Sequence, residues 1–582
     1  MQILTSDIEL GTPVANIGAL VLDNARRFGD QPAFAERIDG GPYRYCSWNR
    51  LGRDVLAVAA ALDTRNTDNP RIAFIAGNSY ARHVCELAVM ASNRISVPIF
   101  AGYPPGRMAE LLEFSDVDVL VTDQPEQVLA LDHDVLPERL MLLTEAEPRA
   151  LVDYRQRGGS VQRVADILGA SSTPSMEDTE NKMRAVVPDT ICLIMYTSGT
   201  SGFPKGVQLT HGNLMSQQKA LKIRWQPEAG LRMLCYLPWH HSFGGLFERF
   251  FAVSSGACLA LDDGCGKDVD RLLENFAEIR PQLFFSVPKI YQEIAARVQA
   301  DPATEQAFFH PELKFVFTAA APLPLSTSEV FRAREIPVVE GWGLTETSPC
   351  CTLTPLSLDR TPGIVGFPIP GVEVALDEEG EILVRGANVM RGYFRNDTET
   401  GKVFTEDGWF RTGDIGELGP EGVRIVSRRE RMFKLSNGEK VFPAQLEARI
   451  HARCQFIKYA YVFGSGQHQP HMLVFPSRQA LEGCGRVPDC ANPDDPKQLA
   501  HCLSSCVADI NAQEAAGFRS ICRALVIGRE LSIEDNELTP SFKLIPKQIE
   551  QRYADCIRAM EQDDYEGLPD DVFVLNLEEK SQ

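Results

Sequence analysis

The stretch YTSGTSGFPKGV, from Tyr196 to Val207, combines residue types that can surround a polyphosphate. Its glycines let the backbone adopt positive φ and bring N–H groups close to a ligand. Its hydroxyl groups and its ammonium group add donors for anionic oxygens. The apolar run from Ile191 to Tyr196 predicts a buried strand that leads into the loop. The residues that we predict to hold phosphate are Thr197, Ser198, Gly199, Thr200, Ser201, Gly202 and Lys205.

This loop does not fit the Walker pattern G-x-x-x-x-G-K-[ST]. Pro204 separates Gly202 from Lys205, and Gly206 stands where a Ser or Thr ligand for Mg²⁺ should follow the lysine. A kinase or ATPase of the Walker type is therefore disfavoured. The loop instead resembles the phosphate-binding signature of the adenylate-forming superfamily, which contains acyl-CoA synthetases, luciferases and the adenylation domains of peptide synthetases.

A second candidate segment is GWGLTET, from Gly341 to Thr347. Glu346 offers a carboxylate, and Mg²⁺ favours one or two carboxylates together with substrate oxygens. Trp342 offers an aromatic face for adenine. Read alone, the segment could also be a turn that ends a strand, with a Thr that caps a helix. By resemblance, its aromatic residue packs on adenine and its Thr-Glu pair holds phosphate and metal. The resemblance adds Gly343 and, in the segment TAAAPLPLS, Ala320 as nucleotide-binding residues.

Two further segments match the superfamily in order. In GWFRTGDIGEL, Asp414 can accept hydrogen bonds from ribose hydroxyls. In SRRERMFKLSNGE, the resemblance makes Arg428 a nucleotide contact and Glu430 the interdomain hinge, where the family usually has Asp or Lys. It also places the loop from Lys434 to Gly438 at the thiol acceptor. Without the other motifs these arginines would be read as a solvated cationic patch.

The catalytic candidates come from two more segments. Lys543 in ELTPSFKLIPKQI matches the superfamily's C-terminal lysine, with Lys547 as a competitor. A cation there can stabilise charge that develops when a carboxylate approaches a phosphate. In CYLPWHHSFGG, the resemblance implies an aromatic residue or His at the acyl-carboxylate end, which by register is His241 rather than His240, although such histidines often only fill polar turns. Together with Lys543 and His241, Thr345 completes the catalytic set. The glycines after His241 suggest room for an acyl tail.

These residues need a scaffold that brings distant segments together. Strands and helices alternate from Ile17 to about Phe250, which predicts parallel sheets covered by helices. Residues 145–189 read as a polar surface loop, and two alternating runs around Gly380 read as a hairpin. We predict an α/β fold: a large N-terminal domain (1–427) of βαβ layers with a small β-subdomain, a small mobile α+β domain (428–560), and an acidic tail (561–582) in which VFVLNL could dock as a strand.

Composition and net charge limit the classes of partner and the cellular location that we expect for the chain. The chain has 582 residues and a net charge of −21, which disfavours nucleic acid and anionic lipid as partners. No run of eighteen apolar residues occurs, so no membrane span is expected. The N-terminal segment lacks the basic region of a secretory signal. The 15 cysteines without a C-x-x-C pair favour a reduced cytoplasmic location.

The resemblance is closest to long-chain fatty acyl-CoA synthetases, notably in FKLSNGE. It implies activation of a carboxylic acid, such as a medium- or long-chain fatty acid, by ATP and Mg²⁺ to acyl-AMP and pyrophosphate. The acyl group would then pass to the thiol of coenzyme A. Three alternatives stay open: transfer to the phosphopantetheine of an acyl carrier protein, activation of an aryl acid as in cinnamate-type ligases, and a non-catalytic nucleotide-binding protein.

Overall fold

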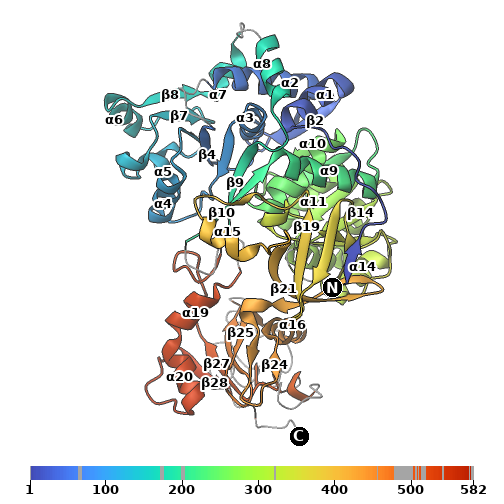
Figure 1. The fold of residues 1–582 in the computed structure, drawn as a ribbon, viewed down its shortest axis with the longest axis vertical. Coiled ribbons are helices and arrows are strands. Elements are labelled where there is room, and N and C mark those ends of the chain that lie inside the picture. Colours follow the sequence, from blue (N-terminus) through green and yellow to red (C-terminus); the bar gives the residue numbers. More distant parts are fainter. Residues whose placement is uncertain are drawn as a thin grey trace.

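The computed structural model describes residues 2–62, 69–170, 176–197, 203–319, 321, 323–454, 456–477, 503–504, 507–508, 510–512, 520–539, 543–575 and 577. The chain forms a large body built on two sheets and a smaller α+β body below it (Figure 1). Within these ranges, no helix is both long and apolar enough to cross a membrane.

The first sheet has eight strands, and its central strands run parallel. Its order is β20 (Gly392–Tyr393), β10 (Lys205–Thr210), β9 (Ile191–Thr197), β5 (Ile95–Pro98), β4 (Arg71–Ile75), β6 (Val119–Thr122), β7 (Arg139–Leu142) and β8 (Ser160–Arg163). Helix α3 (Tyr80–Ala91) begins after Ser79, whose side chain accepts a hydrogen bond from the N–H of Arg82. Such N-caps satisfy amides that the helix leaves unpaired.

The second sheet has fourteen strands. Its order is β1 (Ile3–Thr5), β18 (Val372–Leu376), β19 (Glu381–Gly386), β21 (Phe410–Gly419), β22 (Gly422–Arg428), β17 (Ile364–Pro368), β16 (Thr352–Leu353), β15 (Val338–Trp342), β14 (Phe315–Thr318), β13 (Leu283–Ser286), β11 (Arg232–Cys235), β12 (Cys258–Leu261), β2 (Pro32–Arg37) and β3 (Tyr43–Ser47). The half from β15 to β2 is parallel, whereas β1, β16–β19, β21 and β22 pair antiparallel. Strands β18 and β19 are the predicted hairpin around Gly380, with Val372 opposite Gly386.

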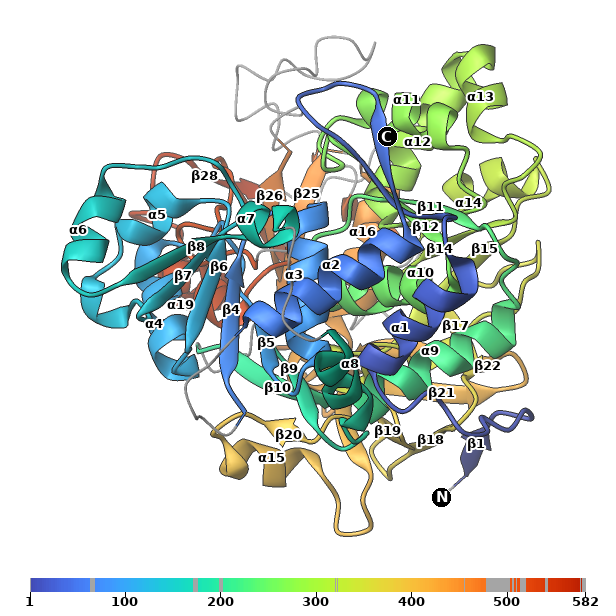
Figure 2. The ribbon, with the colours of Figure 1, turned by 90° about the horizontal axis from the view of Figure 1, so that it is seen from above.

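One hydrophobic core joins the two sheets. Helices that contribute to it include α1 (Ile17–Phe28), α2 (Trp48–Ala61), α3, α9 (His211–Trp225) and α10 (Arg249–Ser255). Figure 2 shows these helices between the sheets. The outer face of the second sheet is covered by α11 (Val269–Ile279), α12 (Pro288–Ala300) and α14 (Leu325–Arg332), and that of the first by α4 (Pro105–Ser115). This layering confirms the predicted α/β fold class with a large N-terminal domain.

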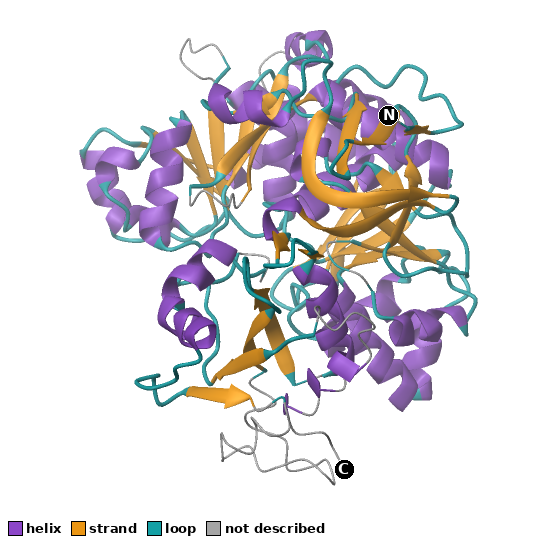
Figure 3. Cartoon of the chain, turned by 60° about the horizontal axis from the view of Figure 1, so that its bottom comes forward, coloured by secondary structure: helices purple, strands orange, loops and turns teal. Residues whose placement is uncertain are grey.

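The smaller body has its own four-stranded sheet. The strands are β25 (Ile457–Phe463), β26 (His471–Pro476), β27 (Arg523–Ile527) and β28 (Val572–Leu575), and helices α16 (Pro443–Arg453), α19 (Pro546–Arg552) and α20 (Ala554–Gln562) belong to the same body (Figure 3). Because β28 pairs antiparallel with β27, residues 572–575 are part of this sheet rather than of an acidic tail. The docking of VFVLNL is thus seen at its first four residues.

The prediction of an irregular loop over residues 145–189 is wrong. This stretch contains α6 (Ala150–Gln156), β8, α7 (Val164–Gly169) and α8 (Met176–Ala185). Its polar composition led to the prediction of a loop, because only a few side chains in this stretch are buried, such as Leu151, Tyr154 and Met183. Short elements that rest on the rim of a larger core need few apolar residues.

Candidate active site

Lys205 is placed by the hairpin of β9 and β10, in which it lies opposite Thr197. Its Nζ lies 2.7 Å from Oε2 of Glu399 in α15 (Asp397–Val403) and 5.1 Å from the ring centroid of Tyr393. The hydrogen bond from Lys205, joined by one from Lys402, lowers the pKa of Glu399 to about 2. The rest of the predicted phosphate loop, Ser198, Gly199, Thr200, Ser201 and Gly202, lies outside the described residues, as does Ala320.

Glu346 is buried beside this lysine, with 9% of its surface exposed. Its Oε1 accepts a hydrogen bond of 2.9 Å from the Tyr393 hydroxyl, and its main-chain carbonyl accepts one of 2.7 Å from the N–H of Met390. Burial and the charge of Glu346 raise the pKa of Tyr393, which therefore stays a donor. Oε2 makes no hydrogen bond to any residue in the described ranges.

This arrangement fits a magnesium ion shared with a substrate. Mg²⁺ is commonly bound by one or two carboxylates plus phosphate oxygens rather than by a cage of protein ligands. Glu346 supplies one oriented carboxylate with an open oxygen. In the part of the chain that the structure describes, no group of three or more His, Cys, Asp or Glu side chains could hold a metal by itself.

The predicted adenine and ribose residues meet although they come from separate motifs. Nε1 of Trp342 donates a 2.8 Å hydrogen bond to Oδ2 of Asp414, and Nε of Arg428 lies 2.8 Å from Oδ1. Strands β21 and β22 set this pair, because Asp414 and Arg428 are directly opposite each other. Burial raises the pKa of Asp414, and the charge of Arg428 opposes that effect.

Gly343 follows Trp342 at a point where the chain closes on itself. A Cβ on this residue would lie 1.8 Å from the carbonyl oxygen of Pro349. The turn between them carries Thr345, whose hydroxyl donates to Oγ of Ser242 at 3.2 Å. The glycine therefore permits a tight turn that joins the Thr345–Glu346 pair to the segment of His241.

The two neighbouring histidines have different surroundings. The His240 ring packs at a tilt against Phe100 with ring centroids 4.5 Å apart, whereas His241 is influenced by the charge of Lys543. Burial, with the charge of Lys543 as a second cause, lowers the pKa of His241 to about 4. The following glycines do not open a tunnel as expected. A Cβ on Gly244 would meet the Leu237 carbonyl oxygen at 2.7 Å, so close backbone packing explains the small residues there.

Lys543 belongs to the smaller body, yet it interacts with residues of the larger one. Its side chain is exposed, so a ligand can reach it. Desolvation by the surrounding protein and the positive charge of Arg428 lower the pKa of Lys543. The negative charge of Asp414 opposes these two effects. Lys543 is therefore near enough to Arg428, Asp414 and His241 for their charges and protonation to be coupled electrostatically. Lys547, the competitor, is also exposed but lies in α19.

The predicted hinge and acceptor residues follow Arg428 in the chain. Glu430 is the central residue of a 3₁₀ turn, Arg429–Arg431, and its negative charge contributes to the raised pKa of Tyr393. Lys434 and Gly438 belong to the hairpin of β23 (Phe433–Lys434) and β24 (Lys440–Val441), and Gly438 takes the turn with φ of 84°. The Lys434 carbonyl accepts a hydrogen bond from Gly466 inside the smaller body.

The sequence motifs miss three residues of this site: Tyr393, Glu399 and Ser242. Tyr393 and Glu399 reach Lys205 because β20 pairs with β10, a contact between segments almost 190 positions apart. No spacing rule predicts such a pairing. Ser242 follows His241 directly, and its small hydroxyl beside a motif residue was the one signal available.

Comparison with known sequences identifies related proteins along nearly the whole chain. A family profile described as AMP-binding enzyme matches residues 21–394, and one described as AMP-binding enzyme C-terminal domain matches residues 430–564. Long-chain-fatty-acid–CoA ligase 6 of Homo sapiens is 27% identical over 611 positions, covering 90% of this chain and 85% of that protein. Long-chain-fatty-acid–CoA ligase FadD15 of Mycobacterium bovis is 26% identical, covering 94% and 97%.

Solved structures share the fold. The O-succinylbenzoate coenzyme A synthetase of Bacillus subtilis, in complex with AMP, aligns with a TM-score of 0.70 and 19% identity over 93% of this chain and 98% of that chain. The adenylation domain of a carboxylate reductase from Mycobacterium chelonae aligns with a TM-score of 0.74 and 20% identity over 95% and 92%.

Proposed function

Because the chain belongs to the AMP-binding enzyme family, we propose that it is an acid–CoA ligase that activates a medium- or long-chain fatty acid through an acyl-AMP. One observation carries the proposal: Trp342, Asp414 and Arg428 from three motifs contact one another, and the charge of Lys543 from the smaller body acts on Asp414 and His241. The names of relatives at 26–27% identity support a fatty acid as substrate.

In the first step a carboxylate oxygen attacks the α-phosphorus of ATP, and the bond from that phosphorus to pyrophosphate breaks. Lys205 and Thr197, with the loop that follows, would hold the β- and γ-phosphates. Glu346 would hold Mg²⁺, which neutralises phosphate charge when bound. Asp414 would accept the ribose hydroxyls and Trp342 would pack on adenine, with Gly343, Ala320 and Arg428 close by. Lys543 would bridge the carboxylate and the α-phosphate, where preorganised positive charge stabilises the transition state.

Neutral His241 suits the acyl end of this site. Since its pKa is about 4, it carries no charge at neutral pH and can orient a carboxylate by a hydrogen bond. In the second step a thiolate attacks the acyl carbonyl and AMP leaves. We propose that rotation of the smaller body about Glu430 removes Lys543 and brings the Lys434–Gly438 hairpin to the site, a hinge motion of a known kind.

One experiment tests this function. The protein is incubated with ATP, Mg²⁺ and a panel of alkyl and aryl acids, first without an acceptor and then with coenzyme A or an acyl carrier protein. We expect pyrophosphate release that depends on a fatty acid, and a thioester with coenzyme A. A thioester with the carrier protein alone, or dependence on an aryl acid, would select the corresponding alternative. ADP release without acid dependence would refute the proposal.

A matched pair of variants checks the assignment of the lysine. Lys543→Ala should lower acid-dependent pyrophosphate release by about 10²–10³-fold, the usual cost of removing one preorganised transition-state contact. Lys547→Ala changes an exposed lysine four residues away and should retain the wild-type rate. The opposite pattern would make Lys547 the catalytic lysine.

A further inference from the structure

The turn that follows Glu346 is held from behind by a buried amide. Nδ2 of Asn388 donates two hydrogen bonds of 3.0 Å, to the carbonyl oxygens of Thr347 and Cys350. The Asn388 carbonyl in turn accepts a 2.8 Å hydrogen bond from the Ser348 hydroxyl. Asn388 is only 1% exposed. One side chain therefore fixes both ends of the turn, and Glu346 lies directly before it.

The segment of Asn388 is itself anchored to a helix of the large body. Nδ2 of Asn213, in α9, donates 2.8 Å hydrogen bonds to the carbonyls on either side, those of Ala387 and Val389. Two residues further on, the N–H of Met390 binds the Glu346 carbonyl. A continuous set of hydrogen bonds thus runs from α9 through Asn388 to the metal-binding candidate.

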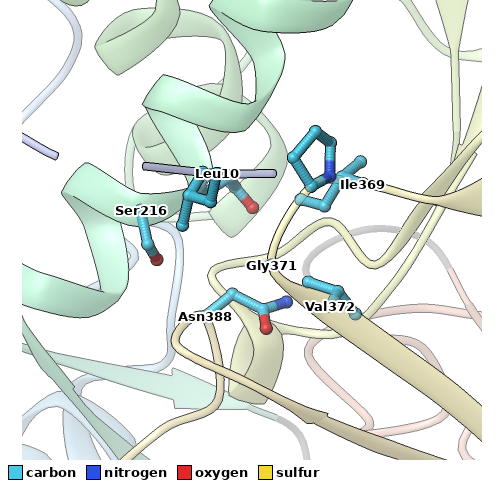
Figure 4. A pocket seen from close by; sticks show the side chains of 8 residues that line it. Leu10, Ser216, Ile369, Gly371, Val372 and Asn388 are labelled. Carbon is cyan, nitrogen blue, oxygen red and sulfur yellow. The ribbon is translucent and has the colours of Figure 1, made fainter. Parts of the chain in front are cut away.

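A second amide completes the hold on the turn. Oε1 of Gln217, also in α9 and fully buried, accepts a 2.7 Å hydrogen bond from the N–H of Cys350. Figure 4 shows Asn388 in the wall of a small pocket, which Gln217 and Leu10 also line. Within the described chain, Oδ1 of Asn388 and Nε2 of Gln217 lack hydrogen-bond partners. Buried amide atoms without partners lower the stability of the folded state. Here they occur in the same side chains that form the hydrogen bonds to the turn.

We propose that Asn388 is a positioning residue that orients the Glu346 carboxylate toward the magnesium ion of the nucleotide. This inference rests on the proposed function, because it takes Glu346 as the ligand. The reason is geometric: the carboxylate is attached to a turn whose two ends are fixed by Asn388, so the direction of Oε2 depends on that amide. Groups that orient metal ligands typically contribute 10–100-fold to metal affinity or activity.

The test measures how much Mg²⁺ strengthens binding of a non-hydrolysable ATP analogue. Calorimetry with excess Mg²⁺ and with EDTA gives this factor for wild type and for Asn388→Ala. We expect the Mg²⁺-dependent factor to fall about 10-fold or more in the variant, with the affinity in EDTA unchanged. In the adenylation assay the Mg²⁺ concentration at half-maximal rate should rise by a similar factor.

Two further variants separate positioning from stability. Asn16→Ala removes another buried amide whose Nδ2 binds two main-chain carbonyls, those of Arg184 and Val186, neither of which belongs to the Glu346 turn or to the segment of Asn388. It should lose stability yet keep the wild-type Mg²⁺ factor. Gln217→Met removes the acceptor for Cys350 and should reduce that factor as Asn388→Ala does, which keeps the test valid if Asn388→Ala does not fold.

The outcomes distinguish this inference from the proposed function. If wild type shows a Mg²⁺ factor that Asn388→Ala and Gln217→Met both retain, Asn388 is structural only and the inference fails while the function stands. If wild type itself shows no Mg²⁺ factor and no acid-dependent pyrophosphate release, the proposed function and the inference fall together.

Discussion

At the scale of single residues, the charge of Lys543 sets a pH limit on the proposed reaction. Its pKa is lowered by the surrounding protein and by Arg428, so the ammonium loses its proton at a lower pH than an ordinary lysine. Positive charge is present below this pKa and lost as pH rises through it. Adenylation should therefore fall on the alkaline side of the pH–rate profile.

Replacement by arginine checks this assignment. Lys543→Arg keeps its charge to above pH 12, so its slower reaction should show the alkaline fall at higher pH than wild type. Lys547→Arg should leave the wild-type profile in place. Alkaline falls at the same pH in wild type and Lys543→Arg would show that another group titrates.

The hydroxyl of Tyr393 is expected to matter at the same scale. Tyr393→Phe removes the 2.9 Å hydrogen bond to Oε1 of Glu346 and leaves the carboxylate free to turn. We expect about a 10-fold loss of kcat/KM for ATP in the adenylation assay. Tyr43→Phe, which removes a buried hydroxyl bound to the Leu261 carbonyl, is the matched control and should keep kcat/KM. Equal losses in both would mean that only general stability is affected.

Single residues also show which parts of the site can be predicted from the sequence. Trp342, Asp414 and Arg428 were predicted from three motifs, and the structure brings them into contact. Each of these three motifs can be recognised from neighbouring residues in the sequence, whereas the contact between them depends on strands β15, β21 and β22. Asn388 and Tyr393 act through pairings between distant segments, which leave no local pattern. Their roles follow only from the packing of the sheets.

At the scale of elements, the turn after β15 tolerates no added atom at Gly343. A Cβ there would lie 1.8 Å from the Pro349 carbonyl oxygen, so Gly343→Ala must push the Thr345–Glu346 turn away. We expect a loss of about 1–3 kcal/mol in the free energy of unfolding, as in other overpacked sites, and weaker binding of the ATP analogue. Denaturant unfolding and calorimetry measure the two effects.

Gly401 in α15 provides the contrast. Among the described residues, no atom outside the local backbone of its own helix lies within 4 Å of the position of its Cβ, and its backbone is helical. Gly401→Ala should keep stability or raise it by up to about 1 kcal/mol, the difference in helix propensity. If both substitutions change the unfolding free energy equally, the close contact at Gly343 is not the cause.

Helices and strands with a strong hydrophobic periodicity were predictable from the sequence. The short elements at the rim of the large body were not. The βαβ segments around α3 and the hairpin of β18 and β19 carry buried apolar residues at regular spacing. The helices of residues 150–185 bury few side chains, so their period is faint. Gly244 illustrates a second limit: the sequence shows a small residue, but only the structure shows that it touches backbone rather than open space.

At the scale of the whole molecule, a short segment joins the two bodies and forms ion pairs with both of them. Arg429 pairs with Glu379 and Glu381 of the large body, whereas Arg431 pairs with Glu447 in α16 of the smaller one. Glu430 lies between them. Rotation of the smaller body about Glu430 can therefore leave both ion pairs intact.

A proline at this position should separate the two half-reactions. Glu430→Pro fixes φ of residue 430 and limits the backbone conformations open to Arg429, so it should hinder the rotation that the second step needs. Pyrophosphate release should stay near the wild-type rate, while thioester formation in single-turnover assays is lost. Glu430→Ala, which keeps backbone freedom, should retain both. Equal loss of both half-reactions in Glu430→Pro would argue against a hinge.

The position of β28 has a practical consequence for handling the protein. Residues 572–575 cover the side of β27 that would otherwise present unpaired N–H and C=O groups. A chain shortened to end before Val572 would expose this strand edge as a template for a second molecule, and exposed edges of apolar strands promote aggregation. Truncated versions intended for crystallisation should therefore end beyond Leu575.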